Sequence, residues 1–268
     1  MIYVVIPVFE NLFLTKNLIS SIGDKDGMTL IIVDDNPNRL HETYAKDCDF
    51  VYITGDGSNF WGGSINLGLE YIYTNSKSDT DNVVLLNNDV TLNFTLKDFV
   101  KVVGNNVGHP QCYDNKSGRL INSCGRLLLW FPFLIRYPKL GANEFTAVDI
   151  LTGRCLVMNL GTIKLAGGID KNLPHYLGDS NLGLVLNKLG VVCNLYNRYS
   201  VDVDNTQTGI IRSGSNLTLK NVLFDVKSAY NLEHRWTFVR NHNSFFLASL
   251  ILVSMYVKFV LRIIKRAL

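Results

Sequence analysis

The chain has 268 residues, 47% hydrophobic and 18% charged, so it is long enough to bury a core without disulfide or metal support and too apolar to be disordered. The charged fraction is below the roughly 25% of an average soluble domain, which favours contact with lipid somewhere on the molecule. The net charge of +3 is a C-terminal property: from Glu233 onward there are six Lys or Arg and one acid, which leaves a slightly acidic body and excludes a general nucleic-acid surface.

The first residues run directly into an apolar segment, with no basic stretch or small-residue cleavage site, so we expect no secretory signal and a cytosolic body. The five cysteines are far apart and include no Cys-x-x-Cys pair. In a reducing compartment this pattern predicts free, buried thiols, and it implies neither zinc nor disulfides.

Short apolar runs alternate with helical patterns through the first hundred residues. Strands are predicted at 2–6, 29–33, 50–53 and 82–86. Pro7 is expected to end the first strand, and apolar spacing over 12–22 predicts a helix after it. A second helix carries Ile65, Leu69 and Ile72. Alternating strands and helices predict a parallel sheet with helices on both faces.

The polar ends of these strands are the first candidates for a site. Ligands of parallel sheets bind beyond the carboxyl ends of the strands, where Asp34, the glycine-rich stretch 55–63 and Asp89 fall. Acids in such places cost desolvation free energy unless they hold a base, a ribose or a metal. Taken singly, Asp34 also fits a turn former, and Asp89 also fits a helix cap.

The second half of the sequence is less regular. Short strands are expected at 126–130 and 148–158, a helix from Leu177 to Leu189, and a longer amphipathic helix from Thr218 to Val239. We find no internal repeat, low-complexity tract or linker, so a single mixed α/β domain with a C-terminal appendage is the simplest interpretation.

The order of these segments resembles the inverting family 2 glycosyltransferases, which have the nucleotide-sugar-binding fold called GT-A. The first-half segments that carry the resemblance are Pro7-Val8, Asp34-Asp35-Asn36, the glycine-rich stretch with its Asn, and Leu85-Leu86-Asn87-Asn88-Asp89-Val90. In the second half, 148–154, 167–170 and 173–179 look like the acceptor-side block of bacterial polysaccharide, rhamnosyltransferase-like members. Together these motifs cover roughly residues 2 to 190.

The resemblance implies a GT-A domain over 1–240, with a mostly parallel central sheet flanked by helices, a nucleotide-sugar-binding half at 1–105 and an acceptor half at 106–240. Asp34 matches the family's nucleobase-binding aspartate, with Pro7, Val8 and Glu10 on the neighbouring wall. Trp61, Gly62 and Gly63 are expected to place an aromatic wall and backbone N–H groups against the donor. The other implied donor-binding residues are Asp35, Asn59, Asn66 and Asn88.

Asp89 matches the last acid of the family's Asp-x-Asp motif, which binds a divalent cation, Mn²⁺ or Mg²⁺, on the donor diphosphate. Asn87 stands in place of the first acid, which predicts a weaker metal site, although its amide oxygen remains available as a ligand.

Asp179 matches the family's catalytic base, which removes the proton from the acceptor hydroxyl as this attacks the anomeric carbon. Gly178 and Asn181 replace the acids that many relatives have beside it, and the alternative for Asp179 is a cap of the helix near Ser180. His175, Tyr176, Gly153 and Arg154 are candidates for contact with acceptor or diphosphate, the alternative for His175 being a structural role.

The C-terminal appendage, 241–268, combines apolar and basic residues. The apolar run 245–257 is about 20 Å long as a helix, too short for a hydrocarbon core of about 30 Å. From Lys258 onward, Lys258, Arg262, Lys265 and Arg266 share one helical face, which predicts a helix lying in the membrane interface against anionic lipid. A buried terminal helix, an oligomer contact and a tilted or re-entrant insertion are the alternatives.

We therefore expect an enzyme on the cytoplasmic face of the inner membrane that moves a single hexose or deoxyhexose from a nucleotide-diphosphate sugar to a lipid-linked saccharide in surface polysaccharide synthesis. Single addition is expected because Leu232 stands where processive members have Gln before Arg235-Trp236. A catalytically inactive sugar-nucleotide-binding or scaffold subunit is the alternative, suggested by Asn87, Gly178 and Asn181. A nucleotidyltransferase is a third possibility, but the glycine-rich signature with Arg and Lys that such enzymes have at the first strand is absent.

Overall fold

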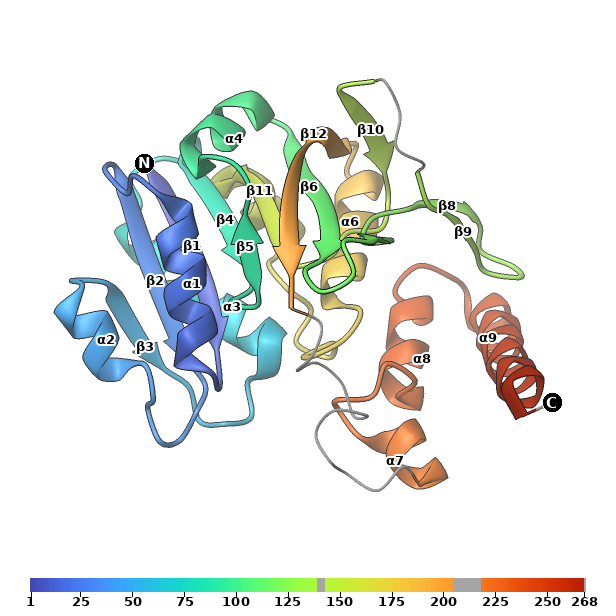
Figure 1. Cartoon of the computed structure of the whole chain (residues 1–268). Helices are drawn as coiled ribbons and strands as arrows, with labels where there is room; N and C mark the ends of the chain where they lie inside the picture. The colour runs from blue at the N-terminus through green and yellow to red at the C-terminus, as the bar shows by residue number, and fades with distance from the viewer. Residues whose placement is uncertain (139–142, 205–217, 268) are drawn as a thin grey trace.

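A ten-stranded mixed sheet runs through the centre of the protein. The computed structural model describes residues 1–138, 143–204 and 218–267 (Figure 1). The main path of the sheet has the order β10-β12-β6-β11-β4-β1-β2-β3, while β5 pairs with β12 and β7 with β6. This mixed α/β architecture, with helices on both faces, is the predicted fold class.

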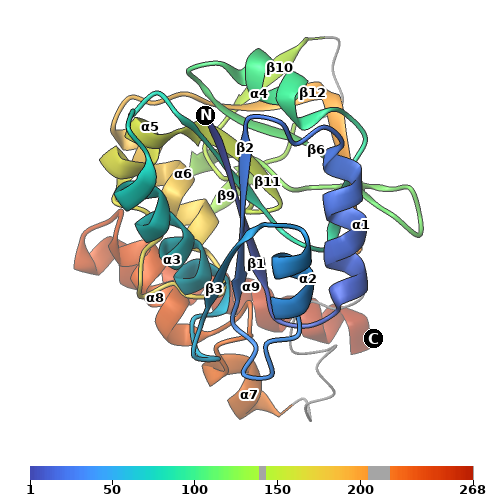
Figure 2. The ribbon, with the colours of Figure 1, turned by 90° about the vertical axis from the view of Figure 1, so that its left-hand side faces the viewer.

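The first half of the chain forms the parallel part of the sheet. Its strands are β1 (Ile2–Val8), β2 (Met28–Asp34), β3 (Val51–Thr54) and β4 (Asn82–Leu86). Its helices are α1 (Leu12–Ile22), α2 (Glu42–Asp47) and α3 (Phe60–Asn75). Figure 2 shows α1 and α3 on opposite sides of the sheet. Side chains of β1 alternate between the two cores: Val4 packs with Leu18 of α1, and Val5 packs with Ile65 of α3.

The second half adds strands that run in both directions. They are β5 (Val90–Leu92), β6 (Val107–Asp114), β7 (Leu120–Ile121), β10 (Phe145–Val148), β11 (Cys155–Asn159) and β12 (Cys193–Val203). The helices are α4 (Leu96–Val103), α5 (Leu160–Ala166) and α6 (Gly178–Lys188). Because β11 is antiparallel to β4, its first residue, Cys155, pairs with Leu86 at the end of β4. The segment before β11 is thus brought to the carboxyl ends of the parallel strands.

The C-terminal helices and a hairpin share a third core. The hairpin consists of β8 (Arg126–Leu129) and β9 (Leu134–Arg136), and the helices of this core are α8 (Leu232–Arg240) and α9 (Phe245–Ala267). The preceding helix, α7 (Leu219–Phe224), contacts α8 and has no buried residue. Ala248, Ile251 and Met255 of α9 are buried against Phe238 of α8. The appendage is therefore anchored to the rest of the protein. No helix in the described parts of the chain meets the length and hydrophobicity needed to cross a membrane.

Most predicted elements are confirmed within one or two residues, and four are corrected. β1 continues through Pro7, because β4 pairs with it only as far as Val5 and the missing N–H of Pro7 interrupts no bond to β4. The expected strand 148–158 is interrupted at 149–154, where the chain leaves the sheet toward the site. The glycine-rich stretch is helical from Phe60 onward.

The expected long helix from Thr218 to Val239 is two helices, α7 and α8. Between them, the Asp225 carboxylate accepts the N–H of Lys227 at 2.7 Å, and Asn231 caps α8 by accepting the N–H of His234 at 2.9 Å. Such side-chain bonds to the backbone compete with continuous helix. Of the cysteines, Cys48 is exposed, which differs from the expected burial, whereas the other four are buried free thiols.

Candidate active site

The carboxyl ends of β1, β2 and β4 meet the loops before β11 and α6 on one side of the sheet, at the lower edge in Figure 1. The backbone N–H of Asn87, just after β4, donates to the carbonyl of Arg154 at 3.2 Å. On the other side of that loop, the N–H of Gly153 donates to Asp179 Oδ2 at 2.8 Å. The segment Gly153-Arg154 therefore connects Asp179 to Asn87, which lies two residues before Asp89.

Asp89 has a buried carboxylate oxygen that is not satisfied. Its Oδ1 has no hydrogen-bond partner among the residues that the structure describes. Burial raises the pKa of Asp89 to about 6, the charge of Arg154 opposes this increase, and the charge of Asp204 adds to it. Leaving a buried carboxylate oxygen unpaired costs free energy. A bound cation would offset that cost.

Asp179 lies in the first turn of α6 and is held by two backbone N–H groups. Its Oδ2 accepts from Gly153, and its Oδ1 accepts from Ser180 at 2.7 Å. Burial raises the pKa of Asp179, while these N–H groups and the charge of Arg154 lower it. The residue that precedes the helix as its N-cap is Leu177, so Asp179 does not occupy the cap position proposed as its alternative role.

Trp61 and Gly153 fit against each other at the centre of the site. A Cβ on Gly153 would lie 2.0 Å from Cζ2 of Trp61, so only glycine allows this contact. The indole N–H of Trp61 donates to Asn87 Oδ1 at 2.7 Å. The amide oxygen of Asn87, expected as a weak metal ligand, is therefore already engaged by Trp61.

Asp34 is completely buried and its carboxylate is saturated by the protein itself. Oδ2 accepts from the backbone N–H of His41 at 3.0 Å and from the Tyr52 hydroxyl at 3.0 Å, and lies 3.2 Å from His41 Nδ1. Oδ1 accepts the N–H of Asn36 at 3.0 Å. Burial alone would raise the pKa of Asp34, but the hydrogen bonds from His41 and Asn36 hold it below its ordinary value. Direct contact with a nucleobase would require some of these bonds to open.

Asp35 organises the start of α3. Its carboxylate accepts from the N–H of Gly57 at 2.9 Å, from Asn59 Nδ2 at 2.9 Å and from the N–H of Phe60 at 2.9 Å. Asn59 also donates to Asp56 at 2.8 Å. Asp35 and Asn59, both predicted to contact the donor, are thus occupied in shaping the loop that leads to Trp61.

Three other predicted donor contacts are directed into the protein. The N–H of Gly62 donates to the carbonyl of Pro174 at 2.6 Å, and that of Gly63 to the carbonyl of Asn59 at 2.9 Å. Asn66 bonds the backbone of Ile169 through both ends of its amide, at 2.8 and 3.0 Å. The expected row of free N–H groups is corrected accordingly, because Gly62 and Asn66 fasten the loop before α6 and the N–H of Gly63 bonds within the first turn of α3.

The residues predicted to line the wall beside Asp34 are Pro7, Val8 and Glu10, at and just after the end of β1. Val8 is buried, Pro7 is half-buried, and Glu10 is exposed. Asn88 Nδ2 donates to the carbonyl of Glu10 at 3.4 Å and to the hydroxyl of Thr15 at 3.2 Å. Asn88 therefore joins the end of β4 to the turn before α1.

His175 and Tyr176 lie in the loop before α6, against the start of α3. The His175 ring lies 5.8 Å from that of Phe60 and 4.7 Å from that of Tyr176. Burial lowers the pKa of His175 to about 4, and the charge of Lys227 adds to this effect. His175 is therefore neutral at pH 7. Its Nδ1 is buried and has no partner among the described residues.

The residues that sequence reasoning missed come from the far end of the chain. Asp204 follows β12, and its N–H donates to the carbonyl of Asp89 at 2.8 Å. Lys227, between α7 and α8, lies 5.4 Å from the ring of Phe9. The position of Asp204 directly after the Val201-Asp202-Val203 alternation at the end of β12 was the available signal for this acid, whereas nothing in the neighbouring sequence marks Lys227.

A metal held by protein side chains alone does not fit this site. In the parts of the chain that the structure describes, no three His, Cys, Asp or Glu residues gather as ligands. The unsatisfied Oδ1 of Asp89 does fit a cation that takes most of its ligands from a diphosphate and water, as Mg²⁺ commonly does.

No protein-family model and no curated protein matches the sequence. The fold is similar to the crystal structure of GalNAc-T7 with UDP, GalNAc and Mn²⁺, with a TM-score of 0.62 and 13% identity over 93% of this chain and 53% of that chain. S. aureus TarS gives a TM-score of 0.56 and 11% identity over 90% of this chain and 39% of that one. S. aureus TarS 1–349 in complex with UDP gives a TM-score of 0.52 and 13% identity over 75% of this chain and 60% of that chain. The chain thus spans about half or less of the first two structures, and it has the GT-A fold of glycosyltransferases.

Proposed function

We propose that the protein is an inverting glycosyltransferase that moves one sugar from a nucleotide-diphosphate donor to an acceptor hydroxyl. One observation carries the proposal. The segment Gly153-Arg154 bonds Asp179 on one side and Asn87, two residues before Asp89, on the other, and the charge of Arg154 acts on both acids, at the edge of the sheet where ligands of such folds bind. The fold shared with glycosyltransferases supports the same reading.

Asp179 is the base in this proposal. A carboxylate with a raised pKa takes a proton from a sugar hydroxyl more readily than an ordinary one. The Gly153 and Ser180 N–H groups fix its orientation, so the hydroxyl oxygen can attack the anomeric carbon from the face opposite the departing diphosphate. A single base suffices for inversion, which agrees with the absence of acids at Gly178 and Asn181.

Arg154 and Asp89 serve the diphosphate. The charge of Arg154 lowers the pKa of both acids, so in this proposal its guanidinium would supply a permanent positive charge for the diphosphate. A divalent cation bound at Asp89 would supply further positive charge for the diphosphate as the glycosidic bond breaks. His175, neutral and flanked by aromatic rings, would offer hydrogen bonding without adding charge.

We further propose that the acceptor is a lipid-linked saccharide of bacterial surface polysaccharide synthesis, reached from the cytoplasmic face of the inner membrane. The support is α9, a 23-residue helix with an apolar composition and basic residues from Lys258 onward. Such a helix suits the membrane interface.

The direct test is product formation with a panel of nucleotide sugars and Mn²⁺ or Mg²⁺, with the anomeric configuration of the product read by NMR. We expect inversion, and at least about a thousandfold loss of turnover in Asp179→Asn, with nucleotide binding retained. The matched control is Asp98→Asn, an exposed acid in α4. Nucleotide-sugar binding without transfer or hydrolysis by the wild type would instead support the inactive binding subunit.

A further inference from the structure

Helix α9 is apolar on two opposite faces. Ala248, Ile251 and Met255 face the protein core. The other side of the helix carries a stripe at helical spacing, and its members expose between 40% and 74% of their surface: Phe246, Leu250, Val253, Val257, Val260 and Leu261. A helix that is apolar all round is normally covered on both sides. The stripe therefore needs a partner.

The β8–β9 hairpin has the same two-sided character. Leu127, Trp130, Phe133 and Ile135 point into the core shared with α8 and α9. The outward positions hold four large apolar residues with 44% to 52% of their surface exposed: Leu128, Leu129, Phe131 and Leu134. The hairpin thus presents a second uncovered apolar surface.

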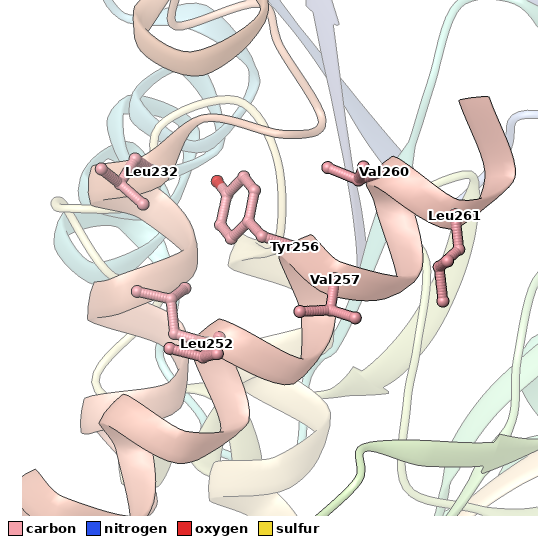
Figure 3. Close-up of a pocket in the computed structure, with 7 residues that line it drawn as sticks. Leu232, Leu252, Tyr256, Val257, Val260 and Leu261 are labelled. Carbon is pink, nitrogen blue, oxygen red and sulfur yellow. The ribbon is translucent and has the colours of Figure 1, made fainter. Parts of the chain in front are cut away.

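The stripe and the hairpin belong to one surface. Lys258 of α9 donates to the carbonyls of Pro132 and Phe133 at the hairpin tip, the latter at 3.2 Å. Figure 1 shows the hairpin and α9 together at the right-hand edge of the molecule, and Figure 2 shows α9 behind the sheet, on that same side. An apolar groove between α8 and α9 extends the stripe toward Leu232 and Tyr256 (Figure 3).

The charges on this surface are all of one sign. Neither 126–137 nor 245–267 contains an acid. Arg126 and Arg136 are exposed at the base of the hairpin, and Lys258 lies at its tip. A surface that combines exposed aromatic and aliphatic side chains with cations is complementary to an anionic bilayer surface.

We propose that the β8–β9 hairpin and the outer stripe of α9 form one membrane-docking surface for anionic phospholipid, in which the hairpin tip enters the interface beside the helix. This inference rests on the membrane location proposed above and adds a second, internal element to it. A helix attached at one end can swing, whereas two elements fixed to each other by Lys258 and a shared core set the orientation of the whole domain. Both elements belong to the core that contains Leu173 and Leu184, on either side of Asp179 in sequence, so docking would fix the orientation of the loop and helix that carry Asp179 relative to the bilayer.

Vesicle co-sedimentation of the full chain tests this, with phosphatidylglycerol-containing vesicles against pure phosphatidylcholine. We expect Leu129→Ser/Leu134→Ser in the hairpin to weaken binding to anionic vesicles by about tenfold or more, and Val253→Ser/Val257→Ser in the stripe to do the same. The matched control is Leu40→Ser/Leu165→Ser, two leucines that are 47% and 60% exposed on other elements. Melting temperature shows that each variant folds.

Wild-type binding to anionic vesicles by the hairpin double variant would overturn the proposal, as would equal binding of the wild type to both lipids. A wild-type dimer in sedimentation velocity that the hairpin variant dissociates, without vesicle binding, would assign the surface to a second copy of the chain. Because vesicle binding needs neither donor nor acceptor, its result is independent of whether the transferase proposal holds.

Discussion

The backbone N–H of Gly153 donates a 2.8 Å hydrogen bond to Oδ2 of Asp179, across 26 residues of sequence. This contact exists because β11 enters the sheet antiparallel beside β4, so that the residues before it lie at the carboxyl ends of the parallel strands. It gives the proposed base a fixed direction and a stabilised negative charge. The close fit of Trp61 against Gly153 in turn holds that N–H in place.

Gly153→Ala is expected to separate Trp61 from the loop and to move the N–H away from Asp179. The added Cβ would sit 2.0 Å from the indole ring, far inside contact distance. Overpacking of this kind typically costs about 1–3 kcal/mol of unfolding free energy, and a loss of activity well beyond the loss of fold should accompany it. Urea unfolding and turnover measured at 20 °C below the melting temperature separate the two effects.

The control is Gly161→Ala in α5, where the added Cβ would have its nearest contact at 3.3 Å. It should leave turnover within about twofold of wild type, since alanine favours helix. Equal activity of the Gly153→Ala and Gly161→Ala variants would show that the Trp61 contact does not position the base.

The pH dependence of transfer should report Asp179. Burial raises the pKa of this carboxyl above its ordinary value, and the base must be ionised to accept a proton, so activity should rise with pH through a window above the usual range of a carboxylic acid. Removal of the positive charge in Arg154→Met should raise that pKa further and shift the rising limb to higher pH. If the pH profile of kcat/KM is the same for the wild type and for Arg154→Met, electrostatic coupling between Arg154 and Asp179 is excluded.

Asp89→Asn should make the ligand-free protein more stable at pH 7.5. The pKa of Asp89 is about 6 in the folded protein against about 4 in the unfolded chain, so unfolding releases a proton between these values and stability falls as pH rises through that window. The substitution removes this penalty, worth about 1–3 kcal/mol above pH 6, and its benefit should vanish near pH 4. Thermal unfolding in chelator across this pH range measures it.

If the proposed donor site holds, Mn²⁺ and UDP together should raise the melting temperature of the wild type, and the same Asp89→Asn variant should lose that stabilisation. A ligand that binds only the folded state raises the melting temperature, and Oδ1 of Asp89 is the unsatisfied group that a cation would bind. Asp24→Asn, an exposed acid that bonds Lys97, is the control. If Mn²⁺ with UDP stabilises both variants equally, Asp89 does not bind the cation.

The parallel strands and both proposed acids were predictable because their signals are local. A buried parallel strand is a continuous apolar run, and Asp89 follows directly after one. Asp179 was reached through a motif that is contiguous in sequence. In both cases the residues that reveal the position are its immediate neighbours.

The hydrogen-bond partners of the predicted polar groups could not be predicted from the sequence, because these partners belong to distant segments of the chain. Asn66 is satisfied by Ile169, 103 residues away, and Gly62 by Pro174. A motif identifies a side chain without identifying what already bonds it. The two-sided apolar character of the hairpin could not be predicted either. In sequence, 126–137 has the pattern of an ordinary strand, and only the packing of α8 and α9 distinguishes its covered side from its exposed side.

Tyr52→Phe tests whether Asp34 is a structural acid. The Tyr52 hydroxyl donates to Asp34 Oδ2, and hydrogen bonds to this carboxylate keep its pKa below the unfolded value. Such a group stabilises the fold above its unfolded pKa, and the contribution is lost as pH falls through its folded pKa. Removal of one charge-assisted bond should therefore cost about 1–3 kcal/mol at pH 7 and progressively less below pH 4, with UDP affinity unchanged. Urea unfolding and calorimetric UDP titration measure both, with Tyr137→Phe, an exposed tyrosine, as the control. A weakened UDP affinity at unchanged stability would instead return Asp34 to the nucleobase contact that the sequence first suggested.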